Sequence, residues 1–175
     1  MKTLYLLRHA KSRWDDPSLP DRDRPLEARG ERDAAKMGKR CLQTNRKPDL
    51  ILSSPATRAV ETAKLVAQSL NYKARDISID DRLYAATKAS LIAVIETLGD
   101  TLDRVMLVGH NPGLAELAHH FDSSITLMKT CALAEFRLES ASWAGLGQVR
   151  PVHTAFDSPK NGRCHFMHGM HGKEA

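Results

Sequence analysis

The chain has 175 residues, of which 42% are hydrophobic and 27% charged, and its formal net charge is +5. This length suits one compact domain with a substantial core, and the composition excludes collagen-like, coiled-coil and wholly disordered proteins. No apolar run approaches the ~20 residues that cross a bilayer, and the first residues lack a signal-peptide core. Three cysteines without a C-x-x-C pair suit a reducing compartment. We therefore expect a cytoplasmic protein with no membrane partner.

The positive charge is concentrated at the N-terminal end. Residues 1–48 hold 13 lysines and arginines against 7 aspartates and glutamates, whereas the rest of the chain is nearly balanced. A basic region of this kind is typical of proteins that bind nucleic acid, an anionic surface or an anionic substrate. Aromatic residues make up only 5% of the chain, and none is interleaved with basic residues as a stacking platform requires, so we expect no nucleic-acid partner.

Short apolar runs alternate with amphipathic stretches along the chain. We expect strands at 3–7, 50–53, 76–79, 104–108 and 132–138, a weaker strand at 148–152, and helices at 28–43, 56–70, 88–98 and 112–121. This alternation predicts a single-domain three-layer α/β/α sandwich, in which a mostly parallel central sheet has helices on both faces. Residues 1–160 would form the domain, with an ordered surface loop at 11–25. Residues 161–175 are predicted to be a flexible tail that contains His and Gly.

Polar residues follow three of the predicted strands. Arg8 and His9 end the first strand, Arg58 lies in the first turn of the helix after the second, and His110 follows the fourth. Ligands of α/β sheets gather at the carboxyl ends of strands, so these side chains are expected to converge. Asn111 is expected to cap a helix that begins at Pro112.

Two arginines and two histidines at one sheet edge favour phosphoryl chemistry. Arginine forks and helix N-termini both bind phosphate oxygens. A neutral imidazole can attack phosphorus and hold the phosphoryl group covalently, and His9 is the candidate nucleophile. His110, Arg8 and Arg58 would stabilise the charge that develops on the oxygens. This chemistry requires neither a metal nor a cofactor.

Four motifs carry a family resemblance. They are Leu-Arg-His-Ala-Lys-Ser at 7–12, Arg-Pro-Leu-x-x-Arg-Gly at 24–30, Ser-Ser-Pro-x-x-Arg-Ala-x-x-Thr-Ala at 53–63 and Val-Gly-His-Asn-Pro-Gly at 108–113. In this order they resemble the histidine phosphatase (phosphoglycerate mutase-like) superfamily, and within it the SixA-like phosphohistidine phosphatases.

The resemblance implies roles for individual residues. His9 would be the phosphorylated nucleophile, and Arg8, Arg58 and His110 would form the phosphate pocket. Arg24 would be a further phosphate or substrate contact, and we place Asn111 among the substrate-binding residues as well. For Arg24 the alternative is a salt bridge with a neighbouring aspartate, either Asp21 or Asp23, in a solvated loop.

The sequence departs from the family pattern at two positions. Ala10 stands where the superfamily has glycine, which is a small-for-small change. The second departure concerns the proton donor. Many relatives have a glutamate in this role, and the best match in this sequence is Asp81. Its shorter side chain would be tolerated with a phosphoramidate substrate, because an imidazole leaves more readily than an alkoxide. Alternatively, Asp81 belongs to a helix-capping loop.

Other polar and aromatic residues are given structural interpretations or left open. Trp14 and Tyr84 are either core-edge packing or walls of the pocket mouth, while His119 and His120 are predicted to be structural. Tail residues Cys164, His165, His168 and His171 could bind a metal, which we interpret as adventitious.

The leading hypothesis is a metal-independent phosphatase that forms a phosphohistidine on His9 and acts on protein phosphohistidine. Larger relatives carry substrate-selecting insertions between the third and fourth strands, where this chain has only the 24 residues from Asp80 to Asp103, so the resemblance implies an open pocket. The alternatives are a small-molecule phosphomonoesterase with Asp81 as general acid, and a non-catalytic module that binds a phosphorylated ligand. The partner is thus a phosphorylated protein or small molecule. The sequence does not determine the oligomeric state, and a monomer is compatible with it.

Overall fold

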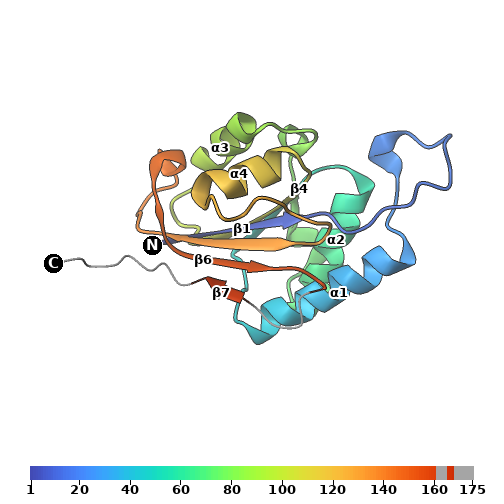
Figure 1. Cartoon of the computed structure of the whole chain (residues 1–175), viewed down its shortest axis with the longest axis horizontal. Helices are drawn as coiled ribbons and strands as arrows, with labels where there is room; N and C mark the ends of the chain where they lie inside the picture. The colour runs from blue at the N-terminus through green and yellow to red at the C-terminus, as the bar shows by residue number, and fades with distance from the viewer. Residues whose placement is uncertain (161–164, 168–175) are drawn as a thin grey trace.

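A computed structural model describes residues 1–160 and 165–167, and its centre is one seven-stranded sheet (Figure 1). The strand order is β3-β2-β4-β1-β5-β6-β7. Neighbours from β3 to β1 pair in parallel, while β5, β6 and β7 pair antiparallel. The strands are β1 (Lys2–Arg8), β2 (Leu50–Ser53), β3 (Ser78–Ile79), β4 (Arg104–Gly109), β5 (Leu133–Leu138), β6 (Pro151–Asp157) and β7 (His165–Met167).

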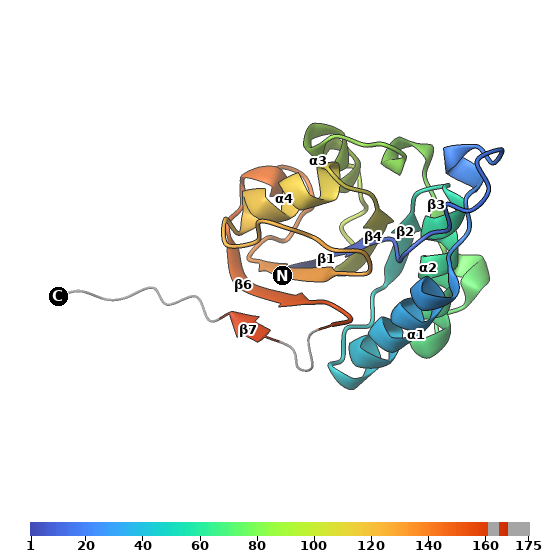
Figure 2. The same ribbon diagram turned by 45° about the vertical axis from the view of Figure 1, so that its right-hand side comes forward.

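Helices cover both faces of this sheet. Figure 2 shows α1 (Ala28–Gln43) and α2 (Thr57–Ser69) on one face and α3 (Lys88–Glu96) and α4 (Gly113–Phe121) on the other. Side chains alternate along β1, so Leu4 and Leu6 pack with the apolar cluster of α3 and α4, whereas Tyr5 and Leu7 pack with that of α1 and α2. The predicted three-layer sandwich is confirmed.

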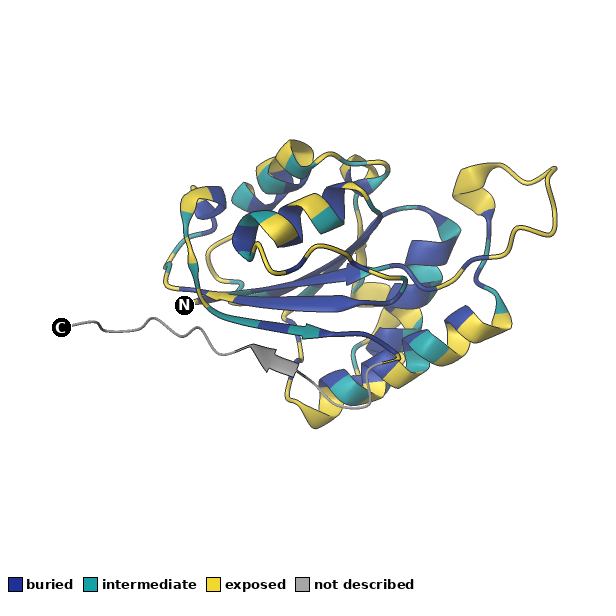
Figure 3. Ribbon diagram, viewed as in Figure 1, coloured by how far each residue is buried: buried dark blue, intermediate teal, exposed yellow. Residues whose placement is uncertain are grey.

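The central strands are buried on both sides, as Figure 3 shows for the middle of the sheet. Residues 105–108 of β4 are at most 1% exposed. Parallel strands with two covered faces read as continuous apolar runs, which is why these strands were predictable. They form a rigid base for the loops at their carboxyl ends.

The loop after β1 is ordered against α1, as predicted. Ser12 forms an isolated bridge with Leu26, and a 3-10 turn spans Asp21–Asp23. A Cβ atom at Gly30 would lie 2.1 Å from the carbonyl oxygen of Lys11. Only glycine therefore allows the first turn of α1 to approach the loop this closely.

Three local expectations were wrong. The strand predicted at 148–152 begins at Pro151 and runs to Asp157, because a 3-10 turn occupies 146–148. The strand predicted at 76–79 is limited to Ser78–Ile79, because residues 74–76 form another 3-10 turn. Asn111 is not the cap of α4. Pro112 holds that position without a side-chain hydrogen bond, while the Asn111 amide donates to the carbonyl of Met128.

Of the predicted tail at 161–175, the structure describes only residues 165–167, which form strand β7 and pair with β6. The rest of the tail lies outside the described residues. Within the described part of the chain, no helix is long and apolar enough to cross a membrane.

Candidate functional site

The two candidate histidines lie side by side at the carboxyl ends of β1 and β4. The parallel register pairs Arg8 with Gly109, and the amide of His9 donates to the carbonyl of Gly109. The rings of His9 and His110 have centroids 5.1 Å apart and are tilted by 52°. Each residue is only 9% exposed. The structure thus brings together the two rings that the sequence placed at separate strand ends.

The local contacts of His9 fix its tautomer. Its Nδ1 lies 2.8 Å from the carbonyl oxygen of Ala10. A carbonyl only accepts hydrogen bonds, so Nδ1 carries the proton and Nε2 of the neutral ring carries the lone pair. Burial, reinforced by His110, Arg58 and Arg8, lowers the pKa of His9 to about 3. At neutral pH, His9 is therefore an uncharged ring with a basic Nε2.

The backbone next to His9 is tied to α2. The buried amide of Ala10 donates to the Thr62 hydroxyl, and that hydroxyl donates to the carbonyl of Arg58. Ala10 is fully buried, and its methyl group is accommodated there. Alanine therefore fits at this position.

His110 is neutral for related reasons. Its Nε2 lies 2.7 Å from the Ser54 hydroxyl, and Nη2 of Arg58 lies 3.5 Å from its Nδ1. Burial and the Arg58 charge lower the pKa of His110 to about 4. The Arg58 guanidinium can only donate, so Nδ1 is the acceptor and Nε2 carries the proton.

Arg8 and Arg58 bring guanidinium groups to the same sheet edge. Arg58 is the second residue of α2 and is 6% exposed. Arg8 donates from Nη1 to the carbonyl of Met128 over 2.9 Å. The Nε atoms of Arg8, Arg24 and Arg58 are buried, with no hydrogen-bond partner among the described residues. Three buried donors at one edge favour an anionic acceptor there.

A half-exposed carboxylate also lies at this edge, and we call it and its partners the Asp21 cluster: Asp21, Arg24, Arg58 and Tyr84. Asp21 accepts from Nη2 of Arg24 over 2.6 Å, and from Nη2 of Arg58 and the Tyr84 hydroxyl over 2.9 Å each. Burial opposes ionisation of Asp21, but these hydrogen bonds outweigh it and lower its pKa to about 2. The carboxylate is thus ionised at neutral pH and neutralises part of the arginine charge.

Two aromatic residues near the site, Trp14 and Tyr84, have different surroundings. Trp14 is 72% exposed, and the Arg24 guanidinium lies 3.5 Å from the centre of its ring. Tyr84 meets the His110 ring edge-on at a centroid distance of 5.7 Å. Tyr84 is therefore a wall of the site, while Trp14 holds Arg24 from the surface side.

Arg24 is buried and forms the salt bridge with Asp21 that the sequence offered as the alternative to a phosphate contact. Through Asp21 it still lies beside Arg58, so the two interpretations are compatible. The Asp81 side chain is 80% exposed and pairs with Arg22 over 3.0 Å. None of the hydrogen bonds described for Asp81 reaches either histidine.

Sequence reasoning missed two contributors to the site. Asp21 was considered only as a neighbour of Arg24, because nothing in the sequence indicates that it reaches Arg58, 37 positions away. Ser54 was quoted within a motif, but its contact with His110 depends on how β2 lies beside β4. A polar residue directly after a buried strand was the only available signal.

The remaining histidines and the cysteines have structural surroundings. His119 and His120 contact the backbone carbonyls of Ile125 and Gly147, as the structural interpretation predicted. Cys41 and Cys131 are both buried in the core. The described residues contain no group of three or more metal-ligating side chains, and the tail histidines and Cys164 proposed as metal ligands fall at 161–175, whose side chains are not described.

Comparison with known proteins points to one family. A model of the histidine phosphatase superfamily (branch 1) matches residues 4–84. A chloroplastic protein of uncharacterised function from Arabidopsis thaliana is 36% identical over 150 residues, which cover 81% of this chain and 69% of the relative. The residues matched by the family model, 4–84, include Arg8, His9 and Arg58.

Solved structures share the fold. A candidate phosphohistidine phosphatase SixA from Agrobacterium tumefaciens superimposes with a TM-score of 0.74 at 27% identity, covering 87% of this chain and 96% of that one. A protein histidine phosphatase SixA complexed with tungstate gives a TM-score of 0.72 at 21% identity, covering 90% and 97%. At this identity the second likeness concerns the fold alone.

Proposed function

Because the chain belongs to the histidine phosphatase superfamily, we propose that it is a phosphatase that forms a covalent phosphohistidine on His9 and acts on protein phosphohistidine. One observation carries the proposal. The Nδ1 proton of His9 is held by the Ala10 carbonyl, so that Nε2 presents its lone pair beside His110. A buried neutral imidazole with a fixed tautomer has the properties of a nucleophile toward phosphorus.

The reaction proceeds in two displacements. In the first, the Nε2 lone pair of His9 attacks phosphorus, the bond from phosphorus to the leaving nitrogen breaks, and that nitrogen takes up a proton. In the second, water attacks phosphorus, the Nε2–P bond breaks, and the lone pair returns to His9. The water releases one proton to solvent, so the enzyme ends unchanged. The low pKa of His9 keeps the lone pair available at neutral pH.

The arginines and His110 stabilise the charge on the transferring group. Arg8 and Arg58 offer buried Nε donors without other acceptors among the described residues. An entering phosphoryl dianion competes with Asp21 for Arg58 and raises the proton affinity of His110, whose ring then donates to an oxygen. This arrangement supports charge stabilisation without a metal ion.

The surroundings of Asp81 favour a phosphoramidate over an ester. Its carboxylate is exposed and held by Arg22, which is a poor arrangement for protonating a leaving alkoxide. The imidazole of a phosphohistidine leaves more readily and depends less on a positioned acid. The name of the Agrobacterium tumefaciens structure, which is 27% identical to this chain, points to the same substrate class.

A substrate panel tests the proposal. Phosphohistidine peptides, alkyl phosphates and aryl phosphates are compared on wild type, on His9→Ala and on His119→Ala as the matched control. We expect hydrolysis of phosphohistidine to fall by at least about 10³-fold in His9→Ala, as for other covalent nucleophiles, and to be preserved in the control. Unchanged turnover in His9→Ala would refute the mechanism.

The variant Asp81→Asn separates the substrate classes. If phosphohistidine is the substrate, we expect less than about a threefold loss on that substrate. Two results together would assign the chain to small-molecule phosphomonoesterases with Asp81 as general acid. The variant would lose about 10²-fold or more of its activity on esters alone, and wild type would hydrolyse esters faster than phosphohistidine. Binding of phosphorylated ligands without any turnover would leave only a binding module.

A further inference from the structure

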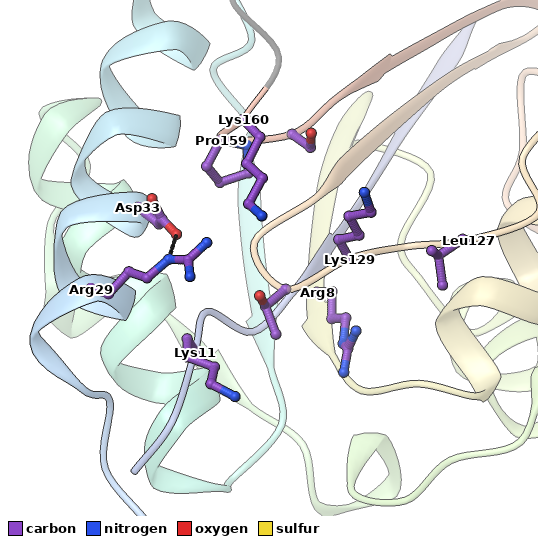
Figure 4. Close-up of a pocket in the computed structure, with 10 residues that line it drawn as sticks. Arg8, Lys11, Arg29, Asp33, Leu127, Lys129, Pro159 and Lys160 are labelled. Carbon is purple, nitrogen blue, oxygen red and sulfur yellow. Dashed lines mark ion pairs between the residues drawn. The ribbon is translucent and has the colours of Figure 1, made fainter.

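A cavity beside Arg8 has five positive side chains among its ten described lining residues, and we call it the basic annex; the five are Arg8, Lys11, Arg29, Lys129 and Lys160. Its volume is about 310 Å³, and among its described lining residues Asp33 is the one that is acidic. The lining comes from the loop after β1, the first turns of α1, the segment before β5 and the segment after β6. In Figure 4 the Lys11 side chain extends toward Arg8, and that of Lys160 extends toward Arg29.

Most of this charge has no counter-ion. Asp33 lies 3.7 Å from Arg29 and compensates it in part. Within the described part of the chain, no carboxylate is in salt-bridge range of Lys11, Lys129 or Lys160. By contrast, buried arginines elsewhere have close partners, such as Arg46 with Glu135 at 2.6 Å. Uncompensated cations around a hollow attract an anionic group more strongly than cations that are already paired.

The annex is structurally continuous with the phosphoryl site. Arg8 belongs to both, since it lines the annex and precedes His9 in the chain. The segment before β5 is hydrogen-bonded directly to this pair, because the amide of Cys131 donates to the carbonyl of His9 and the amide of Arg8 donates to that of Ala132. A substrate bound at His9 can therefore place a second group in the annex.

We propose that the basic annex binds a second anionic group, carboxylate or phosphate, carried by the same substrate as the reacting phosphoryl group. This inference rests on the proposed function and specifies which substrates the site prefers. The group is either an acidic side chain next to a phosphohistidine in a protein or a second phosphate on a small molecule. Both have the charge and hydrogen-bond acceptors that lysine and arginine bind.

The test measures a preference ratio on the full-length chain. One substrate pair is a phosphohistidine peptide with flanking Glu and Asp, and its matched version with Gln and Asn. The other is an alkyl bisphosphate and the corresponding monophosphate. We expect wild type to prefer the more acidic member of at least one pair by about tenfold in kcat/KM, which corresponds to about 1.4 kcal/mol. A preference on the peptides identifies an acidic side chain, and one on the bisphosphate identifies a phosphate.

The double variant Lys129→Gln/Lys160→Gln should reduce this ratio to about one while leaving kcat/KM on the less acidic member unchanged. A charge-matched control, Lys73→Gln/Lys88→Gln, removes the same charge outside the annex and should keep the ratio. Raising the salt concentration should also reduce the preference in wild type. A ratio near one in wild type, or the same loss in both double variants, would overturn the annex proposal while turnover itself persists. If neither pair is turned over and His9 is never phosphorylated, the proposed function fails, and the annex proposal fails with it.

Discussion

The Asp21 cluster and the basic annex flank the same pair of histidines but differ in how their positive charge is compensated. In the cluster, Arg24 and Arg58 already share a carboxylate at 2.6 and 2.9 Å. In the annex, Lys11 and Lys129 have no carboxylate partner among the residues described. The number of cations alone therefore overestimates how strongly the cluster attracts an anion, and it underestimates how strongly the annex does. The cluster holds its donors in position, whereas the annex supplies free charge.

Apart from the loss of His9 itself, the largest effect is expected from removing Arg58, the arginine that joins the cluster to His110. In Arg58→Ala, phosphohistidine hydrolysis should fall by about 10²–10³-fold in kcat/KM, the usual cost of losing one donor to a developing anion. Steady-state kinetics measure this loss, with Lys129→Gln on a neutral-flanked substrate as the comparison. A loss no greater than that of the lysine variant would show that Arg58 is only structural.

Removing the charge of Asp21 should strengthen the binding of an anion, whereas removing Arg58 should weaken it. Asp21→Asn keeps a hydrogen-bond acceptor for Arg58 and Tyr84 but removes the negative charge that competes with phosphate. We expect inorganic phosphate to inhibit this variant about tenfold more strongly than wild type, as measured by its inhibition constant. Weaker or equal inhibition would mean that Asp21 assists anion binding rather than opposing it.

The stability contributed by Asp21 should depend on acidity. Its pKa in the folded protein is lowered to about 2, so the stabilisation is complete above the unfolded value near 3.8 and is lost as the pH falls through about 2. The Tm of wild type should therefore fall more steeply between pH 4 and pH 2 than that of Asp21→Asn. Parallel Tm profiles would contradict the ion pairs described for Asp21.

The smallest expected effect is an absence of titration at His9. Because burial lowers its pKa to about 3, the ring signals of His9 in a nitrogen–proton NMR spectrum should stay constant between pH 8 and 5.5. The nitrogen shifts should report a protonated Nδ1. A shift over this range would mean that His9 is more solvated, or differently paired, than its contact with Ala10 requires.

The sequence predicted regular elements better than it predicted contacts between loops. Helix α1 was predicted with its observed bounds, because its buried residues repeat at helical spacing. Strand β6 was misplaced because its central residues, such as His153 and Thr154, are polar and only half-buried, and so do not read as an apolar run.

The site was predictable only where a sheet strand fixes a residue. His9 and His110 follow neighbouring parallel strands, so their proximity followed from the topology. The position of Asp21 depends on the path of a surface loop, which no periodic pattern encodes. The basic annex likewise depends on the segments of Lys129 and Lys160, which meet only in the folded chain.

The central claim is that His9 accepts the phosphoryl group, and rapid quenching of a turnover reaction tests it most directly. Wild-type enzyme mixed with a phosphohistidine peptide and quenched in alkali within milliseconds should carry an acid-labile phosphoryl group, which peptide mass spectrometry and phosphorus NMR place on Nε2 of His9. A phosphoryl group on another residue, or rapid turnover with no phosphoenzyme at any quench time, would contradict the account.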